Sequence, residues 1–228
     1  LQQTYSVNNS FPQTSTFYEN LPDLLSQLLG YQSPTVKEGM PNLYCGVLCV
    51  VLLGMFLRAT QIRLREKIGA VLVLGFLLLS CNWNILNFIW HGFHFPNMLP
   101  YRFSFLFSFV LITVAYLLIL EQKMKWMDLL AMILLSVLFL VLVYQTDRKQ
   151  AVIYTALTMA AYLLLLLLKR FRLLNRRVFA SGMMLVMLVE MGCHVRTSTE
   201  AVSTSDYVSY PEKYEETEAL LQQLAKED

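Results

Sequence analysis

Charged residues are scarce in this sequence. Only 15% of the 228 residues are charged, whereas 56% are hydrophobic, and the mean hydropathy is +0.50. A soluble domain of this length carries more charge and fewer apolar residues. The formal net charge of +2, without a continuous basic stripe, gives no support for a nucleic-acid-binding surface. The composition therefore predicts an integral membrane protein.

Several motifs of soluble enzymes and energy-coupled transporters are missing. The sequence has no Gly-rich phosphate loop, no Walker motif and no nucleophile elbow. These absences remove the sequence support for ATP-driven transport and for serine hydrolysis. The four cysteines lie within or beside apolar runs, so we interpret them as small core residues and not as a disulfide framework.

Proline is absent from six apolar runs that dominate the middle of the chain. All seven prolines lie outside these runs, so nothing in the sequence forces a helix there to break. Most runs approach the roughly 18–20 residues that a membrane-spanning helix requires. We therefore expect an all-α, polytopic transmembrane helix bundle with about six spans, at residues 43–57, 68–90, 103–120, 127–144, 151–168 and 178–194.

The basic residues predict the orientation, because eleven of the 18 fall in alternate connecting loops. The positive-inside rule makes these loops cytoplasmic and both ends of the chain extracytoplasmic. The residues concerned are Arg58, Arg63, Arg65, Lys67, Lys123, Lys125, Lys169, Arg170, Arg172, Arg176 and Arg177.

Three regions follow from this pattern. Residues 1–42 form an extracytoplasmic loop, in which the amphipathic stretch 21–29 lies along a membrane surface or forms an ordinary loop helix. Residues 43–194 form the transmembrane bundle. Residues 195–228 are a Ser/Thr-rich linker and the start of an extracytoplasmic C-terminal domain, or a disordered tail. Both ends of the chain look cut, so we expect it to be the middle portion of a longer protein.

Polar residues gather at the predicted outer side of the spans. Asn84, Asn87, His91 and His94 follow one another at helical spacing and share one face if the helix reaches His94, although Gly92 could end it earlier. Polar groups inside a membrane are costly and often functional. Asparagines also hold transmembrane helices together, so their functional and structural interpretations carry equal weight.

Glu190 and His194 close the sixth run at the same predicted outer level. Arg102 lies near them in the linear scheme and is a natural partner for a phosphate or a carboxylate. One interpretation is a pocket at the outer headgroup level. The other is that Arg102 neutralises Glu190, while Tyr101 and its aromatic neighbours anchor the protein at the interface.

A metal site has weak support. His91, His94, Glu190 and His194 could supply four ligands, but no cysteine lies beside them to complete a closed zinc site. We expect no metal and no cofactor.

Residues 84–105 (NILNFIWHGFHFPNMLPYRFSF) resemble the YfhO family of bacterial membrane proteins. Residues 41–46 (PNLYCG) and the tail around Tyr210 and Pro211 are similar to the same family. The resemblance implies a fold like that of C-type glycosyltransferases, with a polyprenyl-phosphate-linked sugar as donor. It also implies extracytoplasmic glycosylation of cell-wall polymers such as lipoteichoic acid, and a catalytic carboxylate in an earlier external loop that this chain lacks.

The expected partners are therefore membrane lipids, the polyprenyl-phosphate sugar donor and a cell-wall polymer acceptor, with no nucleic acid. Any general base within this chain would be Glu190, His91 or His94. The alternatives are a membrane transporter or lipid flippase, and a non-enzymatic scaffold for wall-polymer synthesis. The expected substrate- and phosphate-binding residues are Arg102, His91, Asn97, Tyr101, Glu190 and His94.

Overall fold

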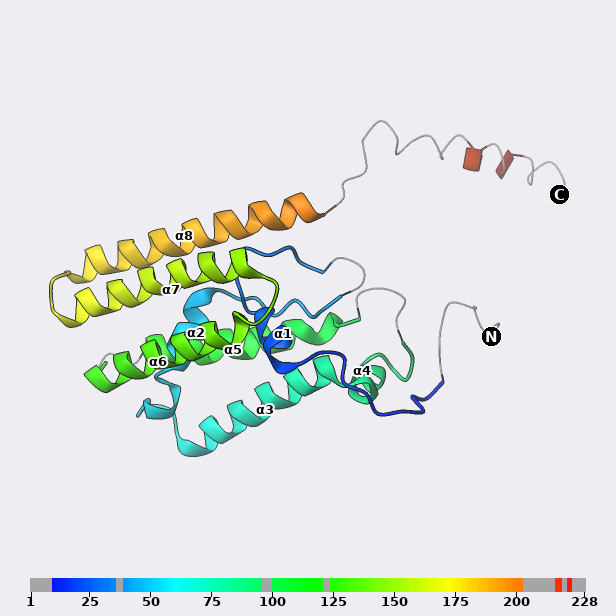
Figure 1. Ribbon diagram of the computed structural model, residues 1–228, viewed down its shortest axis with the longest axis horizontal. Helices are drawn as coiled ribbons and strands as arrows, with labels where there is room; N and C mark the ends of the chain where they lie inside the picture. Colours follow the sequence, from blue (N-terminus) through cyan, green and yellow to red (C-terminus); the bar gives the residue numbers. More distant parts are fainter. Residues whose placement is uncertain are drawn as a thin grey trace.

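The computed structural model describes residues 10–35, 39–95, 100–120, 124–202, 216–218 and 221–222. The long helices lie roughly side by side, with their axes along the longest dimension of the molecule (Figure 1). Within the described residues the only β-pairing is an isolated antiparallel bridge between Phe17 and Trp83. The helices are α1 (Leu21–Ser26), α2 (Val47–Leu53), α3 (Leu64–Asn82), α4 (Asn84–Trp90), α5 (Phe105–Ile119), α6 (Trp126–Val143), α7 (Lys149–Arg170) and α8 (Arg176–Ala201), with short 3-10 helices η1 (Phe56–Arg58) and η2 (Arg102–Ser104).

Four helical segments are long and apolar enough to cross a membrane: Arg102–Ile119, Trp126–Val143, Lys149–Arg170 and Arg176–Ala201. The predicted all-α membrane bundle is therefore confirmed, but the expected count of six spans is not. The predicted first span contains only the seven-residue helix α2 followed by η1, and seven residues cover about 10 Å, a third of the hydrocarbon core. α3 is 19 residues long, but its first turn contains three charged residues, Arg65, Glu66 and Lys67.

The bundle has two chemically different ends. The end that carries η1 and the starts of α3, α6 and α8 holds the basic loops and is called the Arg58 end below. There Arg58 Nε lies 2.8 Å from Asp128 Oδ1 of α6, and the Arg170 guanidinium lies 4.8 Å from the Trp126 ring centroid. The opposite end, called the Arg102 end, carries α1, α4 and η2 (Figure 1).

The short helix α2 lies at the centre of the core, because six of its seven residues are buried. It contacts α5, α6 and α7. At its end, Gly54 meets α6 so closely that an added Cβ would lie 2.3 Å from the Met132 Cα. Only a residue without a side chain allows this approach of two backbones. A broken helix is tolerated at membrane depth when protein surrounds it, as here.

The predicted second span, residues 68–90, is interrupted at Trp83 although no proline is present. Trp83 has extended backbone angles (φ −109°, ψ 121°), and residues 14–19 pair with the chain on either side of it. Asn82 accepts from the Glu19 N–H (2.8 Å) and donates to the Glu19 carbonyl (2.9 Å). Asn84 likewise accepts from the Thr16 N–H and donates to the Thr14 carbonyl. These asparagines therefore hold the N-terminal segment to the helix break.

The amphipathic stretch 21–29 packs into the protein core. Leu24, Leu28 and Leu29 are buried at 3%, 6% and 0% exposure. Asn20 caps α1 by accepting from the Asp23 N–H at 2.9 Å. This packing favours an ordinary helix held against the bundle over one that only lies along a membrane surface.

Candidate functional site

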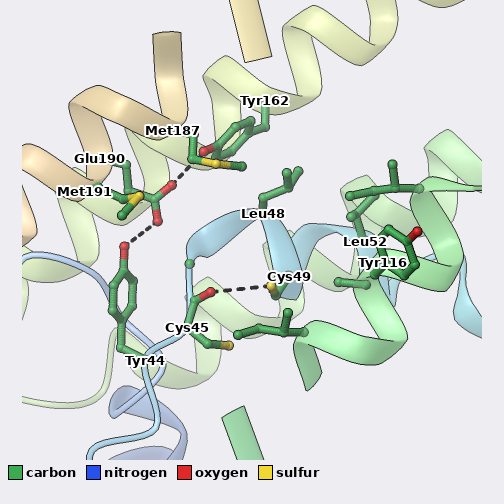
Figure 2. A pocket seen from close by; sticks show the side chains of 14 residues that line it. Tyr44, Cys45, Leu48, Cys49, Leu52, Tyr116, Tyr162, Met187, Glu190 and Met191 are labelled. Atoms are coloured by element: carbon green, nitrogen blue, oxygen red, sulfur yellow. Dashed lines mark hydrogen bonds between the residues drawn. The ribbon is translucent and has the colours of Figure 1, made fainter. Parts of the chain in front are cut away.

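Glu190 is the most buried charged side chain of the described part of the chain, with 2% exposure, and it joins three helices. Its Oε1 accepts hydrogen bonds from the Tyr44 hydroxyl and from the Val47 N–H, both at 2.6 Å. Its Oε2 accepts from the Tyr162 hydroxyl of α7 at 2.7 Å. Figure 2 shows the carboxylate between Tyr44 and Tyr162. A buried carboxylate needs such donors to compensate for lost hydration.

The level of Glu190 differs from the sequence-based expectation. α8 continues to Ala201, eleven residues or about 16 Å beyond Glu190. Glu190 therefore lies near the middle of α8 and not at its end, and residues 195–201 extend the helix into the region assigned to a linker. Glu190 and Arg102 line different cavities.

Gly46 and Val47 shape the backbone contact to Glu190. Gly46 precedes α2 with φ +104°, a backbone conformation that strongly favours glycine. This turn directs the Val47 N–H to the carboxylate, so that a side chain from α8 takes one of the amide groups left unpaired at the start of α2.

His194 lies one helical turn after Glu190 and, like Glu190, contacts Tyr44 in the segment before α2. Its Nδ1 accepts from the Tyr31 N–H at 3.2 Å, and its ring centroid lies 3.9 Å from that of Tyr44. Because Nδ1 is an acceptor, the neutral ring carries its proton on Nε2. His194 lines a small cavity of about 80 Å³ together with polar side chains that include Gln27, Gln32 and Asn42.

Arg102 and Tyr101 line a second cavity of about 270 Å³ at the start of α5, with Asn42 and Ser104. The Ser104 and Ser108 hydroxyls donate to the carbonyls of Asn42 and Leu43, which fixes the segment before α2 against α5. Burial, followed by the neighbouring Tyr18, raises the pKa of the Tyr101 phenol above its ordinary value. Tyr101 therefore stays protonated at neutral pH and can donate a hydrogen bond.

Asn42 and Tyr44 connect these cavities. Asn42 lines both the Arg102 cavity and the His194 cavity. Tyr44 lines the His194 cavity and a third, apolar cavity of about 390 Å³ that contains Glu190. Three hollows thus follow the segment before α2, from the Arg102 end toward the middle of the bundle.

His91 and His94 lie apart from this row of cavities. The His91 Nδ1 is 2.8 Å from the Asn87 carbonyl and its ring packs on Phe103, while the His91 and His94 ring centroids are 6.4 Å apart. The His91 Nε2 is buried without a hydrogen-bond partner in the described structure.

α4 ends at Trp90 and Gly92 has φ +68°, so the helix stops before His94, in agreement with the alternative of an earlier end at Gly92. Asn97, the remaining predicted site residue, lies outside the described residues. No group of three or more His, Cys, Asp or Glu side chains that could hold a metal ion occurs among the described residues.

The comparisons with known proteins decide the family. The family model described as bacterial membrane protein YfhO matches residues 1–228. The chain belongs to the YfhO family. The resemblance seen in residues 84–105 is thereby confirmed, and the apolar helices agree with a YfhO-family membrane protein. No curated protein and no solved structure matches the chain.

Sequence reasoning missed Tyr44, Tyr162 and Asn42 as parts of this YfhO-family site. Tyr44 and Asn42 lie within the family-like stretch 41–46, which was treated only as the entry to a span. Tyr162 lies inside an apolar run, and a hydroxyl at membrane depth requires a partner. That requirement was the available signal for a link between Tyr162 and Glu190, one of the two acids in the predicted spans.

Proposed function

We propose that this protein takes part in extracytoplasmic glycosyl transfer from a polyprenyl-phosphate-linked sugar to cell-wall polymers such as lipoteichoic acid. The observation that carries the proposal is the Arg102 cavity, which combines a guanidinium with neutral hydrogen-bond donors at one end of an apolar bundle. A lipid phosphate needs this combination at the depth where headgroups lie.

The side chains that line the polar cavities suit a phosphorylated lipid head group. Arg102 offers a planar fork of donors for phosphate oxygens, and the protonated Tyr101 phenol lines the same cavity as a neutral donor. The adjoining His194 cavity contributes further amides and an imidazole. The donor's phosphate would lie at Arg102, and its sugar would face the polar side chains around it.

Glu190 serves this function indirectly. Both of its oxygens already accept hydrogen bonds within the protein, so the carboxylate positions Tyr44, α2 and α7 relative to α8. We therefore assign Glu190 as a positioning residue in place of the substrate contact predicted from the sequence.

A lipid flippase is the alternative function. Flipping moves a polar head through the membrane and requires polar groups along the whole path. From Tyr44 toward the Arg58 end, most residues that line the third cavity are apolar. This lining favours a site where the head stays at the Arg102 end.

The test introduces Arg102→Ala into the chromosomal gene and measures the sugar content of lipoteichoic acid by mass spectrometry. Removing a charge-assisted phosphate contact should reduce transfer by about tenfold or more, mainly through a higher KM for the donor. Arg102→Lys should recover part of the activity, because lysine keeps the charge but loses the bidentate fork. Arg196→Ala is the control, because Arg196 is exposed and paired only with Glu200 among the described contacts.

Unchanged lipoteichoic acid in a folded Arg102→Ala protein would refute the assignment of Arg102. If the variant loses transfer but accumulates donor on the cytoplasmic side, the flippase alternative replaces the proposal. Thermal unfolding of both variants separates these results from a loss of folding.

A further inference from the structure

The third cavity is an apolar groove between α2, α5 and α8, with Tyr162 of α7 at its wall (Figure 2). Glu190 and Tyr44 lie at its upper limit, toward the Arg102 end, and Leu52 and Ile119 lie toward the Arg58 end. Along α5, the seven residue steps from Ile112 to Ile119 cover about 10 Å. The groove therefore follows the bundle axis through much of one membrane leaflet.

The groove opens to the surroundings of the bundle between α5 and α8. Ile112, Tyr116 and Ile119 of α5 keep 48%, 58% and 57% exposure, and Met187 and Met191 of α8 keep 41% and 54%. In a membrane, this opening meets hydrocarbon chains and not water. A lipid can enter the groove sideways.

The lining of the groove limits its occupant. Most of its side chains are aliphatic, aromatic or sulfur-containing, and both oxygens of its one carboxylate are already paired within the protein. A hydrocarbon chain needs no polar partner there. The groove, with a volume of about 390 Å³, therefore suits an apolar chain.

The polar cavities beside the groove indicate the kind of lipid. Tyr44 lines both the groove and the His194 cavity, and Asn42 joins that cavity to Arg102. A molecule that fills all three cavities has an anionic polar head and one long apolar chain. A phospholipid has two chains and would leave one of them outside the groove.

We propose that the groove between α2, α5 and α8 binds the chain of the prenyl-phosphate donor, below a phosphate held at Arg102. This inference rests on the proposed function. Ile112 and Ile119 lie ten and 17 residues after Arg102, or about 15 and 25 Å along the helix. The groove thus holds the part of the chain about 15–25 Å from the phosphate.

The experiment uses the full chain in nanodiscs of phosphatidylethanolamine and phosphatidylglycerol, with two photoreactive prenyl phosphates. One carries a diazirine about 20 Å from the phosphate in the extended chain, and the other carries it next to the phosphate. Peptide mapping should find the distant probe on residues 112–119 and 187–191, and the near probe on residues 42–44 and 101–104.

Two tryptophan substitutions on α8 provide a matched pair. Met191 lines the groove at 54% exposure, whereas Leu188 is 56% exposed and does not line it. Met191→Trp should reduce labelling by the distant probe about tenfold, corresponding to roughly 1.4 kcal/mol of lost binding, and Leu188→Trp should leave it unchanged. Ile119→Trp on α5 repeats the blocking test from the opposite wall. Thermal unfolding shows that each variant is folded.

Equal labelling of Met191→Trp and Leu188→Trp would overturn the proposal, as would displacement of the probe by excess phosphatidylglycerol. Because crosslinking does not depend on sugar transfer, the two proposals fail separately. If the distant probe labels the groove but Arg102→Ala leaves sugar transfer unchanged, only the glycosyl-transfer proposal is refuted. If Arg102→Ala loses sugar transfer but the distant probe does not label the groove of the unmodified protein, only the binding site for the prenyl chain is refuted.

Discussion

The clearest quantitative prediction concerns Glu190, the only residue of α8 that is buried. Glu190→Ala removes the acceptor for the Tyr44 hydroxyl, the Tyr162 hydroxyl and the Val47 N–H. A hydrogen bond to a charged group contributes about 1.5–3 kcal/mol in soluble proteins, while interhelical hydrogen bonds in membranes average about 0.6 kcal/mol. Three contacts that act as one unit should together contribute about 3–5 kcal/mol.

Smaller substitutions should follow in order. Tyr162→Phe removes one donor and should cost about 1–2 kcal/mol. Glu190→Gln keeps one carbonyl oxygen for Val47 and Tyr44 but loses the negative charge, so it should fall between Tyr162→Phe and Glu190→Ala. For a chain of this size, 1 kcal/mol shifts Tm by about 2–4 °C. The expected losses in Tm are about 2–8 °C for Tyr162→Phe and about 6–20 °C for Glu190→Ala.

The buried cysteines provide the assay. Cys49 and Cys81 are buried at 9% and 1% exposure, whereas Cys193 is exposed. Cys45 is only partly buried, so both it and Cys193 are replaced by serine, and a fluorogenic thiol reagent then reports unfolding when the two remaining thiols become accessible. Glu200→Ala is the matched control on α8, because it removes a carboxylate whose pair with Arg196 is solvent-exposed.

Glu200→Ala should leave Tm unchanged within error. Equal Tm values for Glu190→Ala and Glu200→Ala would refute the inference that Glu190 holds α2, α7 and α8 together.

Two further predictions concern the backbone contacts of the fold. Gly54→Ala should destabilise the protein by about 1–3 kcal/mol or more, because the new Cβ would lie 2.3 Å from the α6 backbone; Gly69→Ala, whose Cβ meets nothing within 4 Å, should be neutral or stabilising in the same Tm assay. Asn82→Ala should release the N-terminal segment, since it loses two hydrogen bonds to Glu19, and amide exchange of residues 14–19 should accelerate without a matching change in α6. Slow exchange in that variant, or equal Tm for the two alanine substitutions of glycine, would contradict these interpretations.

The sequence by itself determined the class of the protein. Long apolar runs with few charges predict membrane-spanning helices because hydrocarbon leaves no other partner for the backbone polar groups. Among the described residues, Arg58, Lys125 and Arg170 come from different basic loops and meet at the start of α6, because successive helices reverse direction. Which end is cytoplasmic stays a prediction.

Tertiary structure alone decided where the helices break and which polar groups meet. Asn82 and Asn84 interrupt a proline-free run because residues 14–19 offer backbone partners that are distant in sequence. Glu190 pairs with Tyr44 and Tyr162, whereas Arg102, its possible partner in the sequence analysis, lines a different cavity. The reason is that α8 runs past the predicted boundary and places Glu190 beside the buried α2. Local periodicity fixes which face of a helix is apolar, but hydrogen-bond partners depend on the depth at which separate helices pack, which only long-range contacts determine.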